Sequence, residues 1–373
     1  MTDREAYIGL NLVDQLGPVS IRVLAEALGS PAAIFAAPVH AVEAVAGVGA
    51  ERMRALLAAR ERVDPAGEVR RAARLGATIV TLADESYPEP LRAIHDPPSA
   101  LYVRGTLPPE DRRAVAIVGS RRSTWYGRSM ADRLAFELAR AGFTVVSGLA
   151  RGIDQASHEG ALKGGGRTLA VLGGALDRLY PPDAGPLAER IAASGAVLSE
   201  YPPGRAPDRA TFPYRNRIVS GLSMGVILVE GDTRSGAMIT VERATEQGRS
   251  VFAVPGRVDS PASRGPHRLL RDGARLVEDV SDVLDEFSFL LPPERAERPA
   301  PAAGPYPFSF NAEEQRVVEA LAGGTDEADA LARACGLAAP QLSAVLLGLE
   351  LKRVVRMLPG RRVELAVSLQ GGS

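Results

Sequence analysis

Cysteine is almost absent from this chain of 373 residues, which contains a single one, Cys335. One cysteine excludes an intramolecular disulfide and any metal site built from several thiolates. Cys335 falls in a run of small residues with helical spacing, so we expect it to be a buried helix residue. An excess of charge of one sign is also absent, because the chain has 44 Lys and Arg residues and 45 Asp and Glu residues. With a formal net charge of −1, a nucleic-acid site would have to gather its cations locally.

Long apolar runs are missing too. None is long enough to span a bilayer, and Asp3, Arg4 and Glu5 precede only a short apolar segment, which is not typical of a signal peptide. We therefore expect a cytoplasmic protein. The four histidines show no metal-ligand spacing, so no metal is expected. Hydrophobic residues make up 46% of the chain, which is enough for a large core in two or three domains.

The middle of the chain alternates regularly between apolar runs and helical patterns. Because the apolar runs are unbroken, the strands should form a parallel sheet with helices on both faces. This predicts a Rossmann-like, doubly wound α/β domain over 66–290, in which 76–82 is a further strand of the leading segment. The expected strands are 115–118, 143–146, 168–172, 196–198, 225–229 and 251–254, and the expected helices are 128–140, 155–162, 186–193, 215–222 and 237–247.

Smaller domains are expected on both sides of this block. Residues 1–65 read as short helices, and the turn at Gly47-Val48-Gly49 resembles a helix-hairpin-helix motif, which either contacts a DNA phosphate or only packs. Residues 291–307 form a proline-rich linker. Residues 308–373 predict a winged helix, with helices over 313–322, 328–334 and 340–351 and a strand-like end. Its last helix contains no Lys or Arg, and the basic residues follow it: Lys352, Arg353, Arg356, Arg361 and Arg362.

Three strand-to-helix turns should share one edge of the sheet, where helix N-termini bind anions. The first turn is Gly119-Ser120-Arg121, with an arginine where dinucleotide folds need a glycine. This disfavours NAD, so no cofactor is expected. The alternative for Arg121 is an ion pair at the sheet edge. The second turn begins at Ser147-Gly148, whose N–H groups are expected to be free, and Asp154 is expected to cap the next helix and neutralise Arg151.

The third turn surrounds an aromatic ring with cations. Phe212 is expected in a loop, near Arg205, Arg209, Arg215 and Arg217. Single-strand binders combine such a cationic track with a stacking ring, since every base has a π-face. The alternative is that Phe212 packs into the core. The predicted single-strand contacts are Gly119, Ser120, Arg121, Ser147, Gly148, Arg151, Arg209, Phe212, Arg215, Asn216 and Arg217.

Two carboxylates follow strands at the same edge, Glu200 and Glu230. Paired carboxylates can hydrolyse a glycosidic bond; alternatively, these two orient the arginines. Ser235 is a plausible N-cap. His158 has no second ligand nearby in the sequence, and a surface or core histidine is expected rather than a catalytic one.

As a set, these motifs resemble the DNA-processing protein A family, also called Smf. The resemblance covers about 115–280 and rests on 118–121, 147–154, 171–174 with 180–181, 199–200, 212–218, 230 with 235–236 and 240, and 254–256. It implies a homodimer that binds single-stranded DNA in natural transformation, protects it and helps to load the RecA recombinase, without catalysis or cofactor. The family's strand contacts map onto Arg121, Arg209, Phe212 and Arg215-Asn216-Arg217.

Two other functions compete with this one. A nucleotide phosphoribohydrolase of a related Rossmann type would carry Pro-Gly-Gly-x-Gly-Thr-x-x-Glu at the late turn, but residues 230–236 lack the glycine pair and the helix-start glutamate. A regulator could instead bind duplex DNA through the terminal domains, with the winged helix as the main contact.

Overall fold

The computed structural model describes residues 1–288, 310–351, 354–358 and 362–365. The chain divides into two compact units, Met1–Ser288 and Phe289–Ser373. The predicted boundary at 65/66 therefore falls inside the first unit. The predicted linker 291–307 lies outside the described residues.

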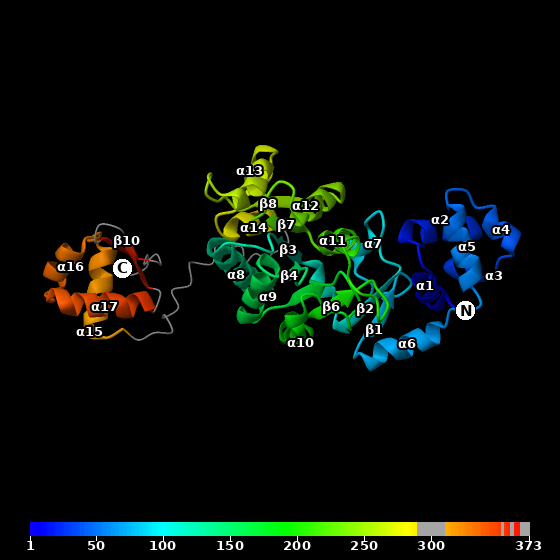
Figure 1. Ribbon diagram of the computed structural model, residues 1–373, viewed down its shortest axis with the longest axis horizontal. Coiled ribbons are helices and arrows are strands. Elements are labelled where there is room, and N and C mark those ends of the chain that lie inside the picture. Colours follow the sequence, from blue (N-terminus) through cyan, green and yellow to red (C-terminus); the bar gives the residue numbers. More distant parts are fainter. Residues whose placement is uncertain (289–309, 352–353, 359–361, 366–373) are drawn as a thin grey trace. The chain divides into compact units, whose positions relative to one another are not determined.

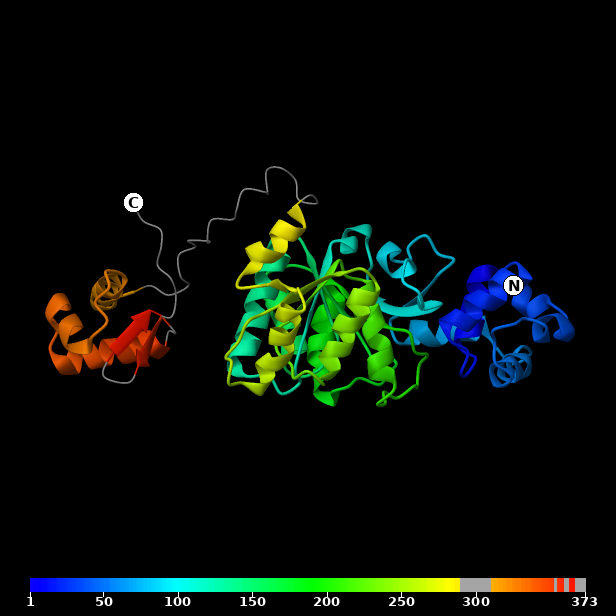
Figure 2. The ribbon, with the colours of Figure 1, turned by 90° about the horizontal axis from the view of Figure 1, so that it is seen from above.

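A nine-stranded sheet forms the centre of the first unit (Figures 1 and 2). Its order is β1-β2-β6-β5-β4-β3-β7-β8-β9, and the strands from β6 to β9 run parallel. The middle strands β3 to β7 are buried along their whole length, as their unbroken apolar sequences predict. The parallel strands are β3 (Ala114–Val118), β4 (Thr144–Ser147), β5 (Thr168–Val171), β6 (Ala196–Ser199), β7 (Gly225–Leu228), β8 (Ser250–Ala253) and β9 (Arg275–Leu276).

Helices cover both faces of this sheet, which confirms the doubly wound prediction. α8, α9 and α10 lie on one side of the strands, and α11 and α12 lie on the other (Figure 1). The core between helices and sheet is built mainly from Ala, Val, Leu and Ile. The helices are α8 (Trp125–Arg140), α9 (Ile153–Lys163), α10 (Gly185–Ser194), α11 (Thr211–Gly221), α12 (Gly236–Glu246), α13 (Arg264–Arg271) and α14 (Val280–Glu286).

The segment before this block extends the sheet by two antiparallel strands, a pairing that its sequence did not predict. β1 (Thr78–Thr81) pairs antiparallel with β2 (Ala100–Gly105), and β2 pairs antiparallel with β6. The sheet is therefore mixed rather than wholly parallel. The short α7 (Glu89–Arg92) lies between the two added strands in the chain. The strand expected over 76–82 is confirmed as β1.

The N-terminal helices have a hydrophobic cluster of their own, which includes Leu10, Leu24 and Leu56. Gly47 adopts a positive φ of 87° in the turn before α5, as the expected Gly-Val-Gly turn requires. Arg4 pairs with Asp84 at 3.1 Å and so ties this part to the segment after β1. The helices are α1 (Asp3–Asn11), α2 (Pro18–Leu28), α3 (Pro31–Ala36), α4 (Val39–Glu43), α5 (Ala50–Ala59) and α6 (Pro65–Arg74).

The second unit contains three helices and a hairpin, as a winged helix requires. These are α15 (Ala312–Ala322), α16 (Ala328–Cys335), α17 (Ala339–Leu351) and the antiparallel pair β10 (Val355–Leu358) and β11 (Arg362–Leu365). Cys335 is buried in α16, as expected. Lys352, Arg353 and Arg361, basic residues expected beyond the last helix, lie outside the described residues.

Among the residues that the structure describes, no single helix is long and apolar enough to cross a membrane. α16 and α17 would reach that length only as a pair, and the pair is bent by 105°.

Candidate nucleic-acid interface

The carboxyl ends of β4, β3 and β7 are neighbours in the sheet. From β3 the strand order runs one way through β4, β5 and β6, and the other way through β7 and β8. β3 and β7 therefore flank the point where the winding direction reverses. In open α/β sheets, ligands bind in the crevice outside this point. The three turns predicted from the sequence lie at this edge.

The turn after β3 is held by backbone bonds on both sides. The Ser120 N–H donates to the Glu230 carbonyl at 2.8 Å, and the Ser120 carbonyl accepts the Ile153 N–H at 3.3 Å. A Cβ on Gly119 would lie 2.9 Å from the Glu230 carbonyl oxygen, so only glycine fits there. Gly119 and Ser120 thus fix the backbone from which the exposed Arg121 side chain projects.

Arg121 lies over Phe212. Its guanidinium carbon is 4.7 Å from the centre of the ring. The ring of Tyr180 meets Phe212 edge-on, with the centroids 5.5 Å apart. A Cβ on Gly173 would come within 2.6 Å of Phe212, so the missing side chain makes room for the ring. Among the described residues Arg121 has no carboxylate partner, and the expected alternative of an edge ion pair is not what the structure shows.

Phe212 lies in a helix, not in the loop that the sequence suggested. α11 begins at Thr211 because Asp208 accepts the N–H groups of Thr211 and Ala210 at 2.9 and 2.8 Å. These backbone bonds lower the pKa of Asp208. Arg205 pairs with Asp208 at 2.7 Å, whereas Arg209 is exposed and has no ion-pair partner in the described part of the chain.

Arg215 was predicted to contact nucleic acid, but the structure places its side chain inside the protein. It is buried and donates to the carbonyl of Gly148 at 2.9 Å and to that of Val171. A Cβ on Gly148 would overlap the guanidinium, so the glycine is needed for this approach. Burial lowers the pKa of Arg215 to about 10, so it stays charged at neutral pH. Arg215 therefore connects α11 to the ends of β4 and β5.

Arg217 is also buried, which corrects its predicted role as a strand contact. It forms a bidentate pair with Glu200 at 2.7 and 3.0 Å and a second pair with Asp96 at 3.1 Å. Its guanidinium carbon lies 3.9 Å from the centre of the Tyr214 ring. Burial alone would lower the pKa of Arg217, but the Glu200 carboxylate raises it above its ordinary value. The alternative that Glu200 orients an arginine is thus confirmed.

Glu230 contacts Thr124 rather than one of the arginines that were considered as its partners. Its carboxylate accepts the N–H of Thr124 at 2.8 Å and the hydroxyl of the same residue. It therefore holds the start of α8. Asn216 is half-buried and donates to the Gly236 carbonyl at 3.2 Å, which joins α11 to α12.

The turn after β4 has no free N–H groups where they were expected. The N–H groups of Gly148 and Ala150 donate to the Asp154 carboxylate at 3.2 and 3.3 Å. The Ser147 hydroxyl points inward to the Ile117 carbonyl at 2.6 Å. Asp154 therefore neither caps α9, whose N-cap is Gly152, nor neutralises Arg151.

Arg151 is exposed and pairs with Asp183 at 3.2 Å. His158 is a core histidine, since its side chain is fully buried and its Nδ1 lies 2.7 Å from the Thr168 hydroxyl. Ser235 is the N-cap residue of α12, but its hydroxyl makes no capping bond.

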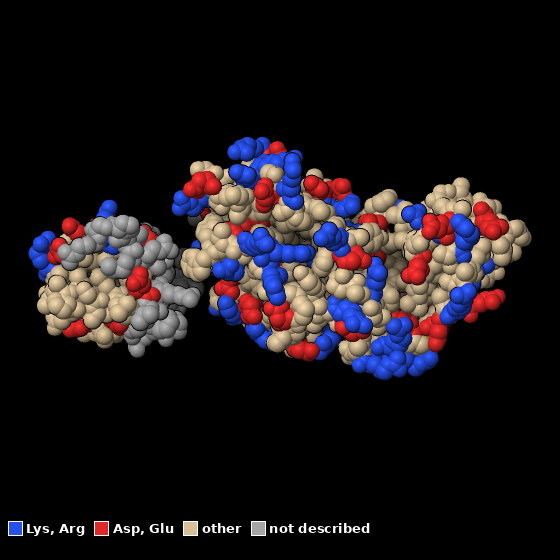
Figure 3. Space-filling model, in the orientation of Figure 1, with Lys and Arg blue, Asp and Glu red and all other residues tan. Residues whose placement is uncertain are grey.

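Three of the eleven predicted contacts present their side chains at the surface: Arg121 and Arg209, which have no carboxylate partner among the described residues, and the ring of Phe212. The other eight hold the backbone of the turns in place or are paired with other residues of the protein. Figure 3 shows Lys and Arg side chains gathered on the first unit, close to where Figure 1 labels α8 and β4. The sequence missed Tyr180 as the edge partner of the ring, because only the fold brings the two residues together.

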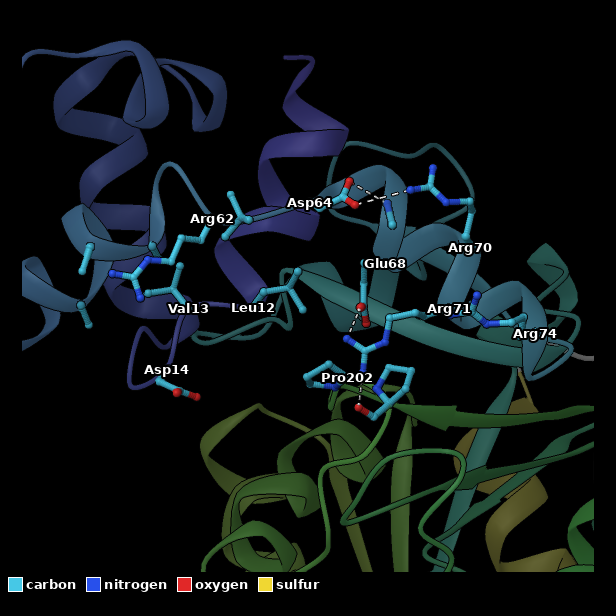
Figure 4. A pocket seen from close by; sticks show the side chains of 16 residues that line it. Leu12, Val13, Asp14, Arg62, Asp64, Glu68, Arg70, Arg71, Arg74 and Pro202 are labelled. Carbon is cyan, nitrogen blue, oxygen red and sulfur yellow. Dashed lines mark hydrogen bonds and ion pairs between the residues drawn. The ribbon is translucent and has the colours of Figure 1, made fainter.

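A second basic surface lies beside α6 and was not predicted. A cavity of about 840 Å³ there is lined by four arginines, Arg62, Arg70, Arg71 and Arg74, with Asp14, Asp64 and Glu68 (Figure 4). Arg71 donates to the Pro203 carbonyl at 2.8 Å and pairs with Glu68 at 3.1 Å. Arg70 pairs with Asp64 at 3.4 Å, so two of the four arginines have carboxylate partners.

Comparisons with known proteins agree with this architecture. The family model for DNA recombination-mediator protein A matches residues 78–288, and that for the DprA winged helix domain matches residues 293–361. Protein Smf of Escherichia coli is 39% identical over 298 residues, which cover 77% of either chain.

Two solved structures are also similar. The crystal structure of DNA processing protein A from Streptococcus pneumoniae has a TM-score of 0.67 and 34% identity, and the match covers 77% of this chain and 98% of that one. DNA processing protein A from Helicobacter pylori, whose structure gave insight into its single-stranded DNA binding mode, has a TM-score of 0.52 and 32% identity, over 57% of this chain and 97% of that one. The chain belongs to the DNA recombination-mediator protein A family.

Proposed function

We propose that this chain binds single-stranded DNA at the carboxyl edge of its sheet, with Phe212 stacking on a base and Arg121 and Arg209 meeting phosphates. The observation that carries the proposal is the half-buried ring of Phe212 beneath an arginine that has no carboxylate partner among the described residues. The single-stranded DNA binding mode of the Helicobacter pylori relative supports the same ligand.

The energies of the two contacts available to Phe212, with Arg121 and with a base, explain how its ring accepts a base. A cation–π contact at an exposed site contributes about 0.5–1 kcal/mol, whereas stacking of a base on an aromatic side chain contributes about 1–3 kcal/mol. A base therefore replaces Arg121 over Phe212 with a net gain. The released guanidinium then turns to the neighbouring phosphate, where it forms a charge-assisted hydrogen bond.

The family suggests the cellular setting. We propose that the protein protects incoming single strands in the cytoplasm during natural transformation, acts as a homodimer and helps to load RecA. Duplex DNA is a further candidate ligand for the terminal domains. These roles require surfaces beyond the one formed by Arg121, Arg209 and Phe212.

We propose binding without catalysis. A ribohydrolase needs a carboxylate free to act at a ribose. Glu200 is held in a buried pair with Arg217, and Glu230 is occupied by Thr124. Incubation with nucleoside monophosphates should release no base by chromatography. Turnover that disappears in Glu200→Gln or Glu230→Gln would contradict this proposal.

The binding proposal is tested by comparing strands of equal length. The full chain should bind single-stranded DNA of mixed sequence more tightly than blunt duplex, as measured by fluorescence anisotropy of labelled oligonucleotides. The affinity should fall as salt rises, because phosphate contacts release counterions. Equal affinity for the two forms would refute single-strand recognition.

A further inference from the structure

Trp125 is the most exposed aromatic side chain among the described residues, at 59%. It is also the chain's one tryptophan. Tryptophan is highly buried on average, so the residues around an exposed ring of this size deserve inspection. None of the contacts described above uses it.

The surroundings of this ring are cationic. Arg121, Arg122 and Arg128 are exposed, and none has a carboxylate partner within the described ranges. Arg128 donates to the Ser123 carbonyl at 2.8 Å, which holds its stem beside the start of α8. The adjacent carboxylate, Glu230, is buried and accepts from Thr124. An apolar ring among unpaired arginines suits a ligand with both bases and phosphates.

The position of the ring relates it to Phe212. Trp125 begins α8, directly after the turn that carries Arg121. The next residue, Tyr126, donates its hydroxyl to the Pro255 carbonyl at 2.7 Å, so this start lies beside the loop after β8. Phe212 lies instead against Gly173, after β5. Four residue steps separate Arg121 and Trp125, so their Cα atoms are at most about 14 Å apart.

We propose that Trp125 is a second stacking platform, which takes a base of the same strand further along the sheet edge, while Arg122 and Arg128 meet its phosphates. This inference rests on the proposed function. The strand would run from the β5 side, over Arg121, across the reversal point to the β8 side. An OB fold, another fold that binds single strands, covers about 4–16 nucleotides, and a site of similar length has room for two platforms.

The unique tryptophan makes the test direct. The full chain is titrated with an oligothymidylate of about 16 nucleotides while tryptophan emission and the anisotropy of a labelled strand are followed together. We expect emission to be quenched with the same midpoint as the anisotropy change. Trp125→Ala should weaken binding about tenfold, equivalent to about 1.4 kcal/mol, and Trp125→Phe should retain most of the affinity.

The controls separate the possible failures. Because Trp125 is exposed, Trp125→Ala should melt at the temperature of the unchanged chain. Absence of any anisotropy change in the unchanged chain would refute the proposed function itself. Normal binding by that chain with unquenched emission and an unaffected Trp125→Ala variant would overturn the second platform alone. A variant that sediments as a smaller species but binds with unchanged affinity would assign the ring to a contact between copies of this chain.

Discussion

Arg121 and Arg209 are the two predicted contacts whose charge is least satisfied within the described residues. Charge reversal at either, Arg121→Glu or Arg209→Glu, should weaken single-strand binding at least tenfold, since a phosphate contact becomes a repulsion. Arg112→Glu is the matched control, because this exposed arginine precedes β3 at the opposite edge of the sheet. Anisotropy titrations of the three variants measure the effect, and an equal loss in Arg112→Glu would mean that only net charge matters.

The aromatic face of Phe212 can be tested with two single substitutions. Phe212→Ala should weaken binding by about 1–3 kcal/mol if the ring stacks on a base. Phe212→Leu separates stacking from packing, because leucine can still fill the space above Gly173 but offers no π-face. Both variants should bind weakly. Restored binding in Phe212→Leu, with a melting temperature lowered only in Phe212→Ala, would assign the ring to packing.

The sequence predicted these surface residues and also two that proved to be buried. Arg215 and Arg217 carry the same side chain as Arg121, and their spacing in the chain does not show which way each one points. Both lie in α11, which begins four residues earlier than expected, at Thr211, and they are buried against different partners inside the protein. Their partners, the Val171 carbonyl and Glu200, come from other strands and could not be paired by inspection.

At the scale of elements, the contact between α9 and β5 depends on a histidine. The Thr168 hydroxyl donates to the Val145 carbonyl at 2.8 Å, so Nδ1 of His158 carries the proton in their 2.7 Å bond. Burial, with a contribution from Arg215, lowers the pKa of His158 to about 3. The Nε2 atom has no partner among the described residues.

This arrangement predicts a loss of stability in acid. The pKa of a histidine in an unfolded chain is about 6.5, whereas burial lowers the pKa of folded His158 to about 3. Below the unfolded value the unfolded chain binds the extra proton, so the free energy of unfolding falls as pH drops toward about 3, by a few kcal/mol. Urea unfolding at several pH values should show a shallower slope for His158→Gln between about pH 4 and 6.5. Equal slopes would show that other groups set the acid limit.

The strands and helices of the middle block were predicted well because the spacing of their apolar residues and their composition indicate which of them are buried. Each end of the six expected strands lies within one residue of the corresponding end of β3 to β8. A strand was expected where β1 lies, but the antiparallel pairing of β1 and β2 with this sheet was not, because two short strands carry no signal for the sheet that they join. β9, with two residues, is too short to show a pattern.

For the whole molecule, the division after Ser288 suggests a simple deletion. Removal of residues 308–373 should leave the first unit folded and still able to bind single strands, because the proposed contacts all lie before that point. Thermal unfolding and anisotropy on the shortened chain measure both properties. Loss of binding with the first unit folded would move the main site to the winged helix.

The two buried arginines of α11 have a consequence for the speed of binding. Arg215 fastens the helix to the ends of β4 and β5, and Arg217 fastens it to Glu200 and Asp96. The ring of Phe212 is therefore in place before any strand arrives, and little of the protein has to be ordered on binding. Association should then be governed by encounter and electrostatic steering, so that added salt slows the on-rate more than it speeds release.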